Sequence, residues 1–265
     1  MAQDRNGVVF VNTCVFGIGK LQKVQEYSDC YKDRIGFEVL PMFDLPEFEG
    51  KFQEVLPILA EHPIRFHGPV FCAEHSAKRG SDAYEETMVH IRKTLPYARE
   101  LESKHLVMHL NNCVVKSDQK DEMVRNALEN YKELQELFGA FDCPIYVENT
   151  GTIAQGNMLL DQAEFTDLCR QEKFDVLIDI GHANANGWDL KRLILDLKDQ
   201  IRAFHMHNND GVHDQHRRLY DGTLDFDAFR SLIDEELPEA VRVIEYTRPE
   251  LEGEALHEDI KTVLG

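Results

Sequence analysis

Short apolar runs alternate with amphipathic stretches along nearly the whole chain. Eight of these runs are rich in β-branched residues, which is typical of buried strands. They cover residues 8–13, 35–40, 64–67, 105–110, 144–148, 174–179, 201–207 and 241–246. The stretches between them repeat apolar residues at helical spacing. These lie at 20–32, 51–62, 81–103, 117–138, 161–171, 190–200 and 226–235, and a last one at 251–264 closes the chain. The pattern predicts a strand followed by a helix, eight times.

Strands that alternate with helices form parallel sheets, and eight such units in about 250 residues match a closed (β/α)8 barrel. The main alternative is an open doubly wound sheet, which places a Gly-rich phosphate loop after its first strand. The glycines there read Gly17-Ile18-Gly19-Lys20 and do not complete that motif. The sequence therefore predicts an α/β protein in which residues 1–265 form a single (β/α)8 TIM barrel domain.

Composition agrees with a globular protein that has a large core, because 43% of the 265 residues are hydrophobic and 29% are charged. Since no run approaches the roughly 20 apolar residues of a membrane span, and the opening MAQDRNG is charged, we expect a cytoplasmic protein with no membrane partner. No C-x-x-C pair occurs, so free thiols are expected rather than a cysteine zinc site. The cysteines are Cys14, Cys30, Cys72, Cys113, Cys143 and Cys169.

The net charge narrows the range of partners. Forty-eight acidic residues against 29 basic ones give a charge of -19, so the average surface repels nucleic acid. The loops that follow the strands look short and carry few cations, among them Lys78, Arg79, Arg217 and Arg218. Nucleic acid is therefore not expected as a partner, and a phosphate-bearing ligand needs local capture by a metal or a few basic groups.

Candidate chemistry gathers where the predicted strands end, which is where barrel enzymes hold their active sites. From the third strand to the eighth, each ends in an imidazole or a carboxylate. The residues are His67, His109, Glu148, Asp179 followed by His182, His207, and Glu245. Burying such groups together costs several kcal/mol unless cations neutralise them. The pattern predicts a metal site at one end of the barrel.

The sequence holds one aspartate and several other histidines that could add ligands to this metal site. In the segment Asp214-Gln215-His216, an extended backbone places the first and last side chains on one side, about 7 Å apart, where they could share an ion. His205 precedes His207 by two residues, so we expect it one layer deeper and outside the ligand set. The other histidines, His62, His75, His90, His105 and His257, are expected to lie at the surface and to take no part in the site.

Several segments resemble the xylose isomerase-like TIM barrels, the superfamily that joins endonuclease IV (AP endonuclease family 2) with sugar and sugar-phosphate isomerases and epimerases. The segments are Val147-Glu148-Asn149-Thr150, Ile178-Asp179-Ile180-Gly181-His182-Ala183, and the run from His207 through Asp214-Gln215-His216 to Asp221-Gly222-Thr223-Leu224-Asp225. The resemblance extends from the first strand to Glu245. The sequence departs from the superfamily pattern at Asp221, where the superfamily has a glycine. The conformation of the turn at this position is therefore not predicted.

The isomerase branch implies one divalent ion held by Glu148, Asp179, His207 and Glu245. The two glutamates would then transfer a proton through an enediolate, while His182, Asn149 and Arg217 bind substrate. The endonuclease IV branch implies three zinc ions, with further ligands from His67, His109, His182, Asp214 and His216. Oxygen and nitrogen ligands favour zinc or manganese, with magnesium or cobalt as alternatives.

We therefore expect a metal-dependent isomerase or epimerase that acts on a small sugar or sugar phosphate. The alternative is a zinc phosphodiesterase of the endonuclease IV type, for which the additional ligands argue. A metal-binding barrel without activity is a third reading, and it is disfavoured because both glutamates and the whole ligand set are present.

Overall fold

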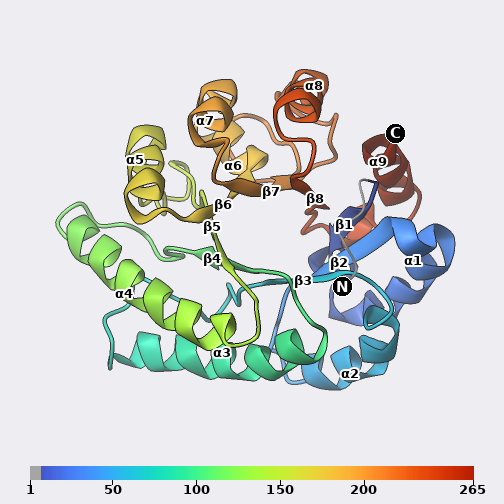
Figure 1. The fold of residues 1–265 in the computed structure, drawn as a ribbon, viewed down its shortest axis with the longest axis horizontal. Helices are drawn as coiled ribbons and strands as arrows, with labels where there is room; N and C mark the ends of the chain where they lie inside the picture. Colours follow the sequence, from blue (N-terminus) through green and yellow to red (C-terminus); the bar gives the residue numbers. More distant parts are fainter. Residues whose placement is uncertain (1–6) are drawn as a thin grey trace.

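In the computed structural model, which describes residues 7–265, eight parallel strands close into a barrel in chain order (Figure 1). The strands are β1 Val9–Asn12, β2 Ile35–Val39, β3 Ile64–His67, β4 Leu106–His109, β5 Ile145–Glu148, β6 Asp175–Asp179, β7 Ile201–Met206 and β8 Val241–Ile244. Pairing of β1 with β8 completes the closure. The predicted (β/α)8 barrel is confirmed, and an open sheet is excluded.

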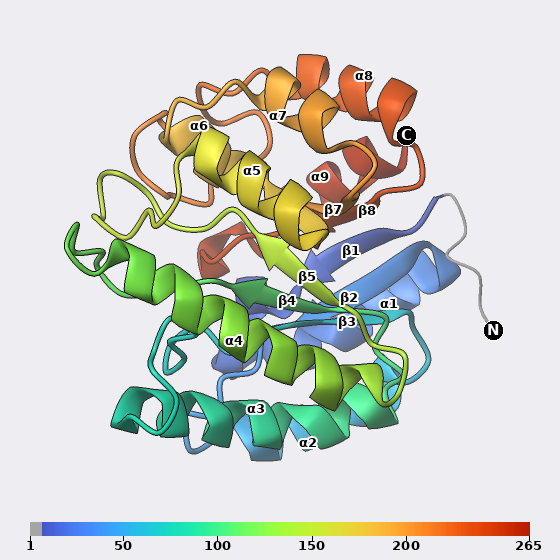
Figure 2. The same ribbon diagram turned by 60° about the vertical axis from the view of Figure 1, so that its left-hand side comes forward.

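Helices surround this barrel on all sides (Figure 1), and the long helices α3 and α4 lie side by side outside it (Figure 2). The α-helices are α1 Val24–Tyr31, α2 Phe48–Leu59, α3 Asp82–Glu100, α4 Lys120–Gly139, α5 Gln162–Glu172, α6 Ile180–Ala185, α7 Leu190–Leu197, α8 Phe226–Glu236 and α9 Glu254–Leu264. Short 3-10 helices occupy Thr13–Phe16, Ile18–Lys23, Lys32–Arg34 and Pro249–Leu251.

Two helices differ from the sequence prediction. The predicted helix at 20–32 begins as the 3-10 turns of Ile18–Lys23 and becomes α-helical only at Val24. The helix α6 was not predicted, because its six residues are too few to show a helical period. It follows β6 directly, and the Asp179 carboxylate caps it by accepting a hydrogen bond from the His182 backbone N–H at 2.6 Å.

The barrel interior is layered, because residues two apart on a strand point to the same face. Val107, Leu177 and Ala203 form a small, fully buried apolar cluster. On each of their strands, the residue two positions further is polar, with His109, Asp179 and His205 following in turn. The larger apolar core contains side chains of both strands and helices, such as Phe66 and Ile91. The apolar layer thus supports a polar layer nearer the C-terminal mouth.

Three of the histidines expected at the surface are instead buried. His75, His90 and His105 have 2%, 8% and 0% of their surface exposed, whereas His62 and His257 are half-buried. For His105 the reason is the strand alternation, since it precedes His109 by four residues and so faces the interior. There its ring packs on Tyr146 with centroids 4.3 Å apart.

We expect stability to fall on acidification, because burial lowers the pKa of both His75 and His105 to about 4. In the unfolded chain these groups titrate near 6.5, so the unfolded state binds more protons between pH 6.5 and 4. The unfolding free energy should therefore drop across that window by up to about 3 kcal/mol per histidine. Urea unfolding of wild type and His75→Leu at pH 7 and 4.5, with chelator present, tests this. An unchanged pH dependence in the variant would contradict it.

No helix within residues 7–265 combines the length and the hydrophobicity that crossing a bilayer requires. The expectation of a cytoplasmic protein rests partly on the charged opening of the chain, and residues 1–6 of that opening lie outside the described residues.

Candidate metal centre

The structure brings the predicted strand-end residues together at the C-terminal mouth of the barrel. The His109 Nε2 atom lies 3.0 Å from Glu148 Oε2, and His67 Nε2 lies 3.5 Å from the same oxygen. On the other side, His207 Nε2 contacts Asp179 Oδ2 at 2.9 Å. Glu245 Oε1 lies 3.9 Å from His67 Nε2. His182 joins the two groups, because its Nδ1 atom lies 3.2 Å from Glu148 Oε1 and 3.6 Å from Asp179 Oδ1. Side chains from six consecutive strand ends thus form one connected cluster.

Two ligand triads stand out within this cluster. The donor atoms of His67, His109 and Glu148 lie within 4.8 Å of one another, and the same holds for His182, Asp214 and His216. Both groups match the additional ligands that the endonuclease IV pattern implied. Their convergence shows that the fold places them at metal-binding spacing, while their role as ligands stays a prediction.

Glu148 connects the two triads. Its Oε2 atom faces His109 and His67, whereas its Oε1 atom lies 3.2 Å from His182 Nδ1. Burial alone would raise the pKa of Glu148, but His109 and His205 outweigh it and hold the pKa well below its usual range. The carboxylate is therefore charged, with one oxygen available on each side.

The loop after β7 supplies Asp214 and His216 through an irregular backbone. His216 has a φ of 44°, in the left-handed region that costs a non-glycine residue about 1 kcal/mol. The extended backbone predicted for this segment is therefore wrong at His216. The side chains nevertheless meet, with His216 Nε2 3.2 Å from Asp214 Oδ1, and His216 Nδ1 hydrogen bonds to the Glu245 carbonyl at 3.0 Å.

Two glycines allow the close packing of this region. A Cβ at Gly181 would overlap the His207 ring, and a Cβ at Gly222 would overlap the Asn208 carboxamide. Asp221, the departure from the superfamily pattern, has an exposed side chain and donates its backbone N–H to the Arg218 carbonyl at 2.9 Å. The turn therefore depends on Gly222, which this chain retains.

Sequence reasoning missed the layer beneath the ligands. Glu38 on β2 is fully buried, and its Oε1 atom lies 2.8 Å from His205 Nε2. Asn12 at the end of β1 donates its Nδ2 to Glu38 Oε1 at 2.9 Å and to Glu245 Oε1 at 3.0 Å. Burial alone would raise the pKa of Glu38, but His205 and His105 hold it below its usual range. The sequence signal that could have identified Glu38 is its charge within the apolar run at residues 35–40.

His205 lies deeper than His207, as expected, yet it touches the ligand set. Its Nδ1 atom is 3.2 Å from Glu245 Oε2 and 3.5 Å from Glu148 Oε2. Together with His67 and Glu245 it also satisfies the spacing of a metal group. The deeper position of His205 therefore does not separate it from the ligands, contrary to the expectation.

The two predicted substrate-binding residues outside the cluster have other contacts. Asn149 is buried and bonds the backbone of Asp179 twice, accepting from its N–H at 2.7 Å and donating to its carbonyl at 3.0 Å. Its amide therefore orients Asp179. Arg217 pairs through its backbone with Asn208, and its guanidinium lies 4.0 Å from Asp221. Substrate binding by either residue stays a prediction.

The chemistry of the cluster fits a divalent metal. Among the described residues, several buried polar atoms of the cluster form no hydrogen bond of good geometry, although some lie within ion-pair distance of one another: Glu148 Oε1, His182 Nδ1, His205 Nδ1, His207 Nδ1 and Asp214 Oδ1. Buried polar atoms are nearly always satisfied, so unsatisfied ones gathered at one place point to a ligand. Imidazole nitrogens and carboxylate oxygens are donors that zinc and manganese accept.

Electrostatics supports the same interpretation. Burial alone would raise the pKa of Asp179, yet His182 and His207 lower it to about 2. Burial would likewise lower the pKa of His216, yet Asp214 raises it to about 9. The carboxylates therefore hold positive charge beside them, and metal cations supply that charge in a compact form.

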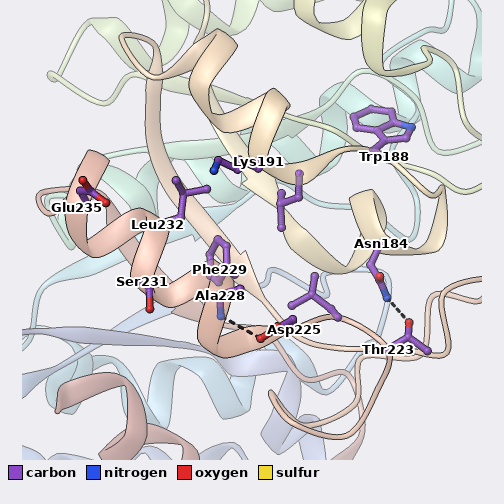
Figure 3. A pocket seen from close by; sticks show the side chains of 12 residues that line it. Asn184, Trp188, Lys191, Thr223, Asp225, Ala228, Phe229, Ser231, Leu232 and Glu235 are labelled. Atoms are coloured by element: carbon purple, nitrogen blue, oxygen red, sulfur yellow. Dashed lines mark hydrogen bonds between the residues drawn. The ribbon is translucent and has the colours of Figure 1, made fainter.

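A separate groove of about 480 Å³ lies between α7 and α8 (Figure 3). Trp188, Phe229 and Leu232 give it a largely apolar lining. At one end Asn184 Nδ2 donates to Thr223 Oγ1 at 3.0 Å. Its ionisable lining residues, Lys191, Asp225 and Glu235, form none of the potential metal groups named above. The candidate chemistry therefore belongs to the barrel mouth rather than to this groove.

An ion pair anchors the loop that carries Asp214 and His216, and we expect its loss to be costly. Arg218 binds Asp259 on α9 through two contacts of 3.0 and 2.9 Å, and Tyr246 donates to the same carboxylate at 2.7 Å. Because Asp259 is buried and Arg218 is one-third exposed, Asp259→Asn should lower the unfolding free energy by about 2 kcal/mol.

Urea unfolding measures this effect, with Glu258→Gln as the matched control. Glu258 pairs with the same guanidinium at 2.7 Å but is exposed, so its loss should cost less than about 0.5 kcal/mol. Equal effects of the two substitutions would show that burial of Asp259 is unimportant.

Comparison with known proteins assigns most of the chain to one family. The profile of the xylose isomerase-like TIM barrel family matches residues 34–263. An uncharacterized protein of Methanocaldococcus jannaschii, MJ1614, is 25% identical over 142 residues, which are 53% of this chain. The match spans about half the length of that relative, 54%.

Solved structures share the fold at low sequence identity. A D-tagatose 3-epimerase-like protein has a TM-score of 0.75 and 20% identity, over 97% of this chain and 98% of that one. The IolI protein with a bound zinc atom has a TM-score of 0.74 and 19% identity, over 97% and 95%. An AP endonuclease of family 2 from Brucella melitensis has a TM-score of 0.69 and 14% identity, over 94% and 95%. At these identities the likeness shows the fold alone.

Proposed function

The chain belongs to the xylose isomerase-like TIM barrel family, and from that premise we propose that it is a metal-dependent isomerase or epimerase of a small sugar or sugar phosphate. One observation carries the proposal. Glu148 on β5 and Glu245, directly after β8, approach the same imidazole nitrogen, His205 Nδ1, at 3.5 and 3.2 Å. Two carboxylates from separated strands thus converge on one region of the barrel mouth, an arrangement that suits a two-base proton transfer.

The residues that would hold the ion are Glu148, Asp179, His207 and Glu245. A divalent ion held there would supply Lewis-acid polarisation of the substrate and so acidify a C–H beside its oxygen. One glutamate would then remove that proton, and a glutamate would return it to the neighbouring carbon or to the opposite face. Carboxylates are weak bases in water, but burial of both glutamates excludes competing solvent, and the imidazoles beside them lower their pKa and so keep them in the charged form that can accept a proton. His182 is buried beside Glu148 and would orient a substrate hydroxyl.

A zinc phosphodiesterase with three metals is the second candidate, favoured by the triads His67/His109/Glu148 and His182/Asp214/His216. A one-metal isomerase does not need them. The expectation of short loops is wrong here, because the connection from β7 to α8 runs from residue 207 to 225. Its cation Arg218 is nevertheless bound to Asp259, and Arg79 on another loop is bound to Glu133 at 3.0 Å. With the charge of -19, these pairs argue against a nucleic-acid substrate.

Metal counting combined with two assays tests the choice. We expect about one zinc or manganese ion per chain at the catalytic position, and uptake of solvent deuterium at a carbon of at least one sugar or sugar phosphate in a panel. Deuterium uptake reports proton abstraction even before the product is known. Cleavage of bis(p-nitrophenyl) phosphate with about three zinc ions at the mouth, and no deuterium uptake, would reverse the order of the two candidates.

A further inference from the structure

A second group of metal-ligand side chains lies away from the barrel mouth. Cys72 belongs to the loop between β3 and α3, and Glu86 and His90 stand one helical turn apart on α3. The Cys72 Sγ, one Glu86 carboxylate oxygen and one His90 ring nitrogen all lie within 4.8 Å of one another. None of the three residues belongs to the proposed catalytic site.

The donors suit one class of ion. Residues four apart on a helix share a face, so Glu86 and His90 form a rigid pair of ligands. The loop cysteine adds the third ligand. A thiolate, an imidazole and a carboxylate are the ligands zinc takes in proteins, and three of them leave one coordination position for water or a further oxygen. All six cysteines of the chain are free thiols, which keeps Cys72 available.

The surroundings favour a cation and allow it to enter. Cys72 and Glu86 line a depression of about 300 Å³, while His90 is buried beneath the surface. Burial raises the pKa of the Cys72 thiol, and the nearby Asp44 and Glu86 carboxylates raise it further, which marks a negative potential at the sulfur. Burial, and after it the positive charge of Lys93, lower the pKa of His90 and so keep its imidazole in the neutral, ligating form. The Lys93 ammonium itself lies over the Phe43 ring, 5.8 Å from its centroid.

From this geometry we infer an outer zinc site, formed by Cys72, Glu86 and His90, that is separate from the catalytic centre. Zinc binding there exchanges the Cys72 thiol proton for the metal, and the proton leaves to solvent. The absence of a C-x-x-C pair made a cysteine zinc site unexpected from the sequence. The fold supplies the remaining ligands from a helix that starts ten residues after Cys72.

The outer site stabilises a segment that reaches the barrel mouth. Ala73, next to Cys72, accepts a hydrogen bond from Asn112 Nδ2 at 2.7 Å. The Asn112 Oδ1 atom in turn lies 2.7 Å from His109 Nδ1. An ion at Cys72 therefore fixes the loop that orients His109, which gives it a structural role.

Cobalt substitution in the full-length protein tests the inference. A thiolate bound to Co²⁺ gives a near-ultraviolet charge-transfer band, whereas the imidazoles and carboxylates predicted to bind metal at the barrel mouth do not. We expect this band in the wild type. Cys72→Ser should abolish it and weaken cobalt binding at the outer site at least about tenfold, and Glu86→Gln should weaken the band. Zinc content should fall by one ion per chain in Cys72→Ser.

Cys113→Ser is the matched control, because Cys113 lines the same depression without belonging to the triad. It should keep the band. Asp179→Asn, which alters the catalytic centre, should also keep the band, so failure of the outer site and failure of the proposed function are distinguishable. A wild type without the band, or a band that survives in Cys72→Ser, overturns the inference.

Discussion

Glu148→Gln and Glu245→Gln should each reduce turnover by at least about 10³-fold, since general-base catalysis alone contributes 10²- to 10⁴-fold. An amide keeps the shape of the carboxylate but removes the base and weakens the metal ligand. For Glu148 the change also disturbs the contacts of Oε1 with His182 and of Oε2 with His109. The measurement is kcat on the substrate found by deuterium uptake, with metal content determined on the same samples.

Glu250→Gln provides the matched control, because Glu250 is exposed and its carboxylate pairs with Arg248 at 2.7 Å, away from the candidate metal ligands. Its turnover should equal that of the wild type. A Glu148 or Glu245 variant that keeps near wild-type turnover removes that glutamate from the proton transfer. If metal content falls together with turnover, the residue acts at least as a ligand, and only retained metal with lost deuterium uptake identifies it as the base.

The sequence was sufficient to predict the barrel and the place of the candidate site. Both predictions depend on local periodicity: apolar runs alternate with helical stretches, and a parallel barrel brings all strand ends to one mouth. His109 and Glu148 illustrate this, since they are 39 residues apart in sequence and are paired residues on adjacent strands. Closure of the barrel by β1 and β8 was implied by the number of units rather than by any pairing signal.

What remained hidden depends on side-chain direction and on loop conformation. Glu38 lies within a strand rather than at its end, so the pattern of polar residues at strand ends does not include it. It is nevertheless fully buried in the same interior. The left-handed φ of His216 has no signature in the residue type. Cys72 and His90 approach one another because the loop after β3 packs on α3, where the Glu74 N–H donates to Thr87 Oγ1 at 2.7 Å. These contacts are tertiary, and spacing in the sequence does not encode them.

Replacing Asp214 and His216 together by alanine should separate the two candidate functions. Both residues belong to the triad with His182, where Asp214 Oδ2 lies 3.3 Å from His182 Nε2. Only the phosphodiesterase mechanism requires an ion there. If the isomerase proposal is right, the double variant keeps one tightly bound metal at Glu148, Asp179, His207 and Glu245, and its KM rises by about tenfold while kcat changes less.

The matched control for this variant is His213→Ala, on the same loop, because His213 is exposed and contacts Asp210 rather than the triad. It should leave both metal content and KM unchanged. The phosphodiesterase mechanism expects a different result for the double variant: loss of at least one zinc ion per chain from the mouth, and with it several kcal/mol of leaving-group stabilisation. We expect the first outcome, because the charge of -19 and the internally paired Arg79 and Arg218 leave little positive surface for a polyanionic substrate. Loss of mouth zinc together with phosphodiester cleavage by the wild type would establish the hydrolase instead.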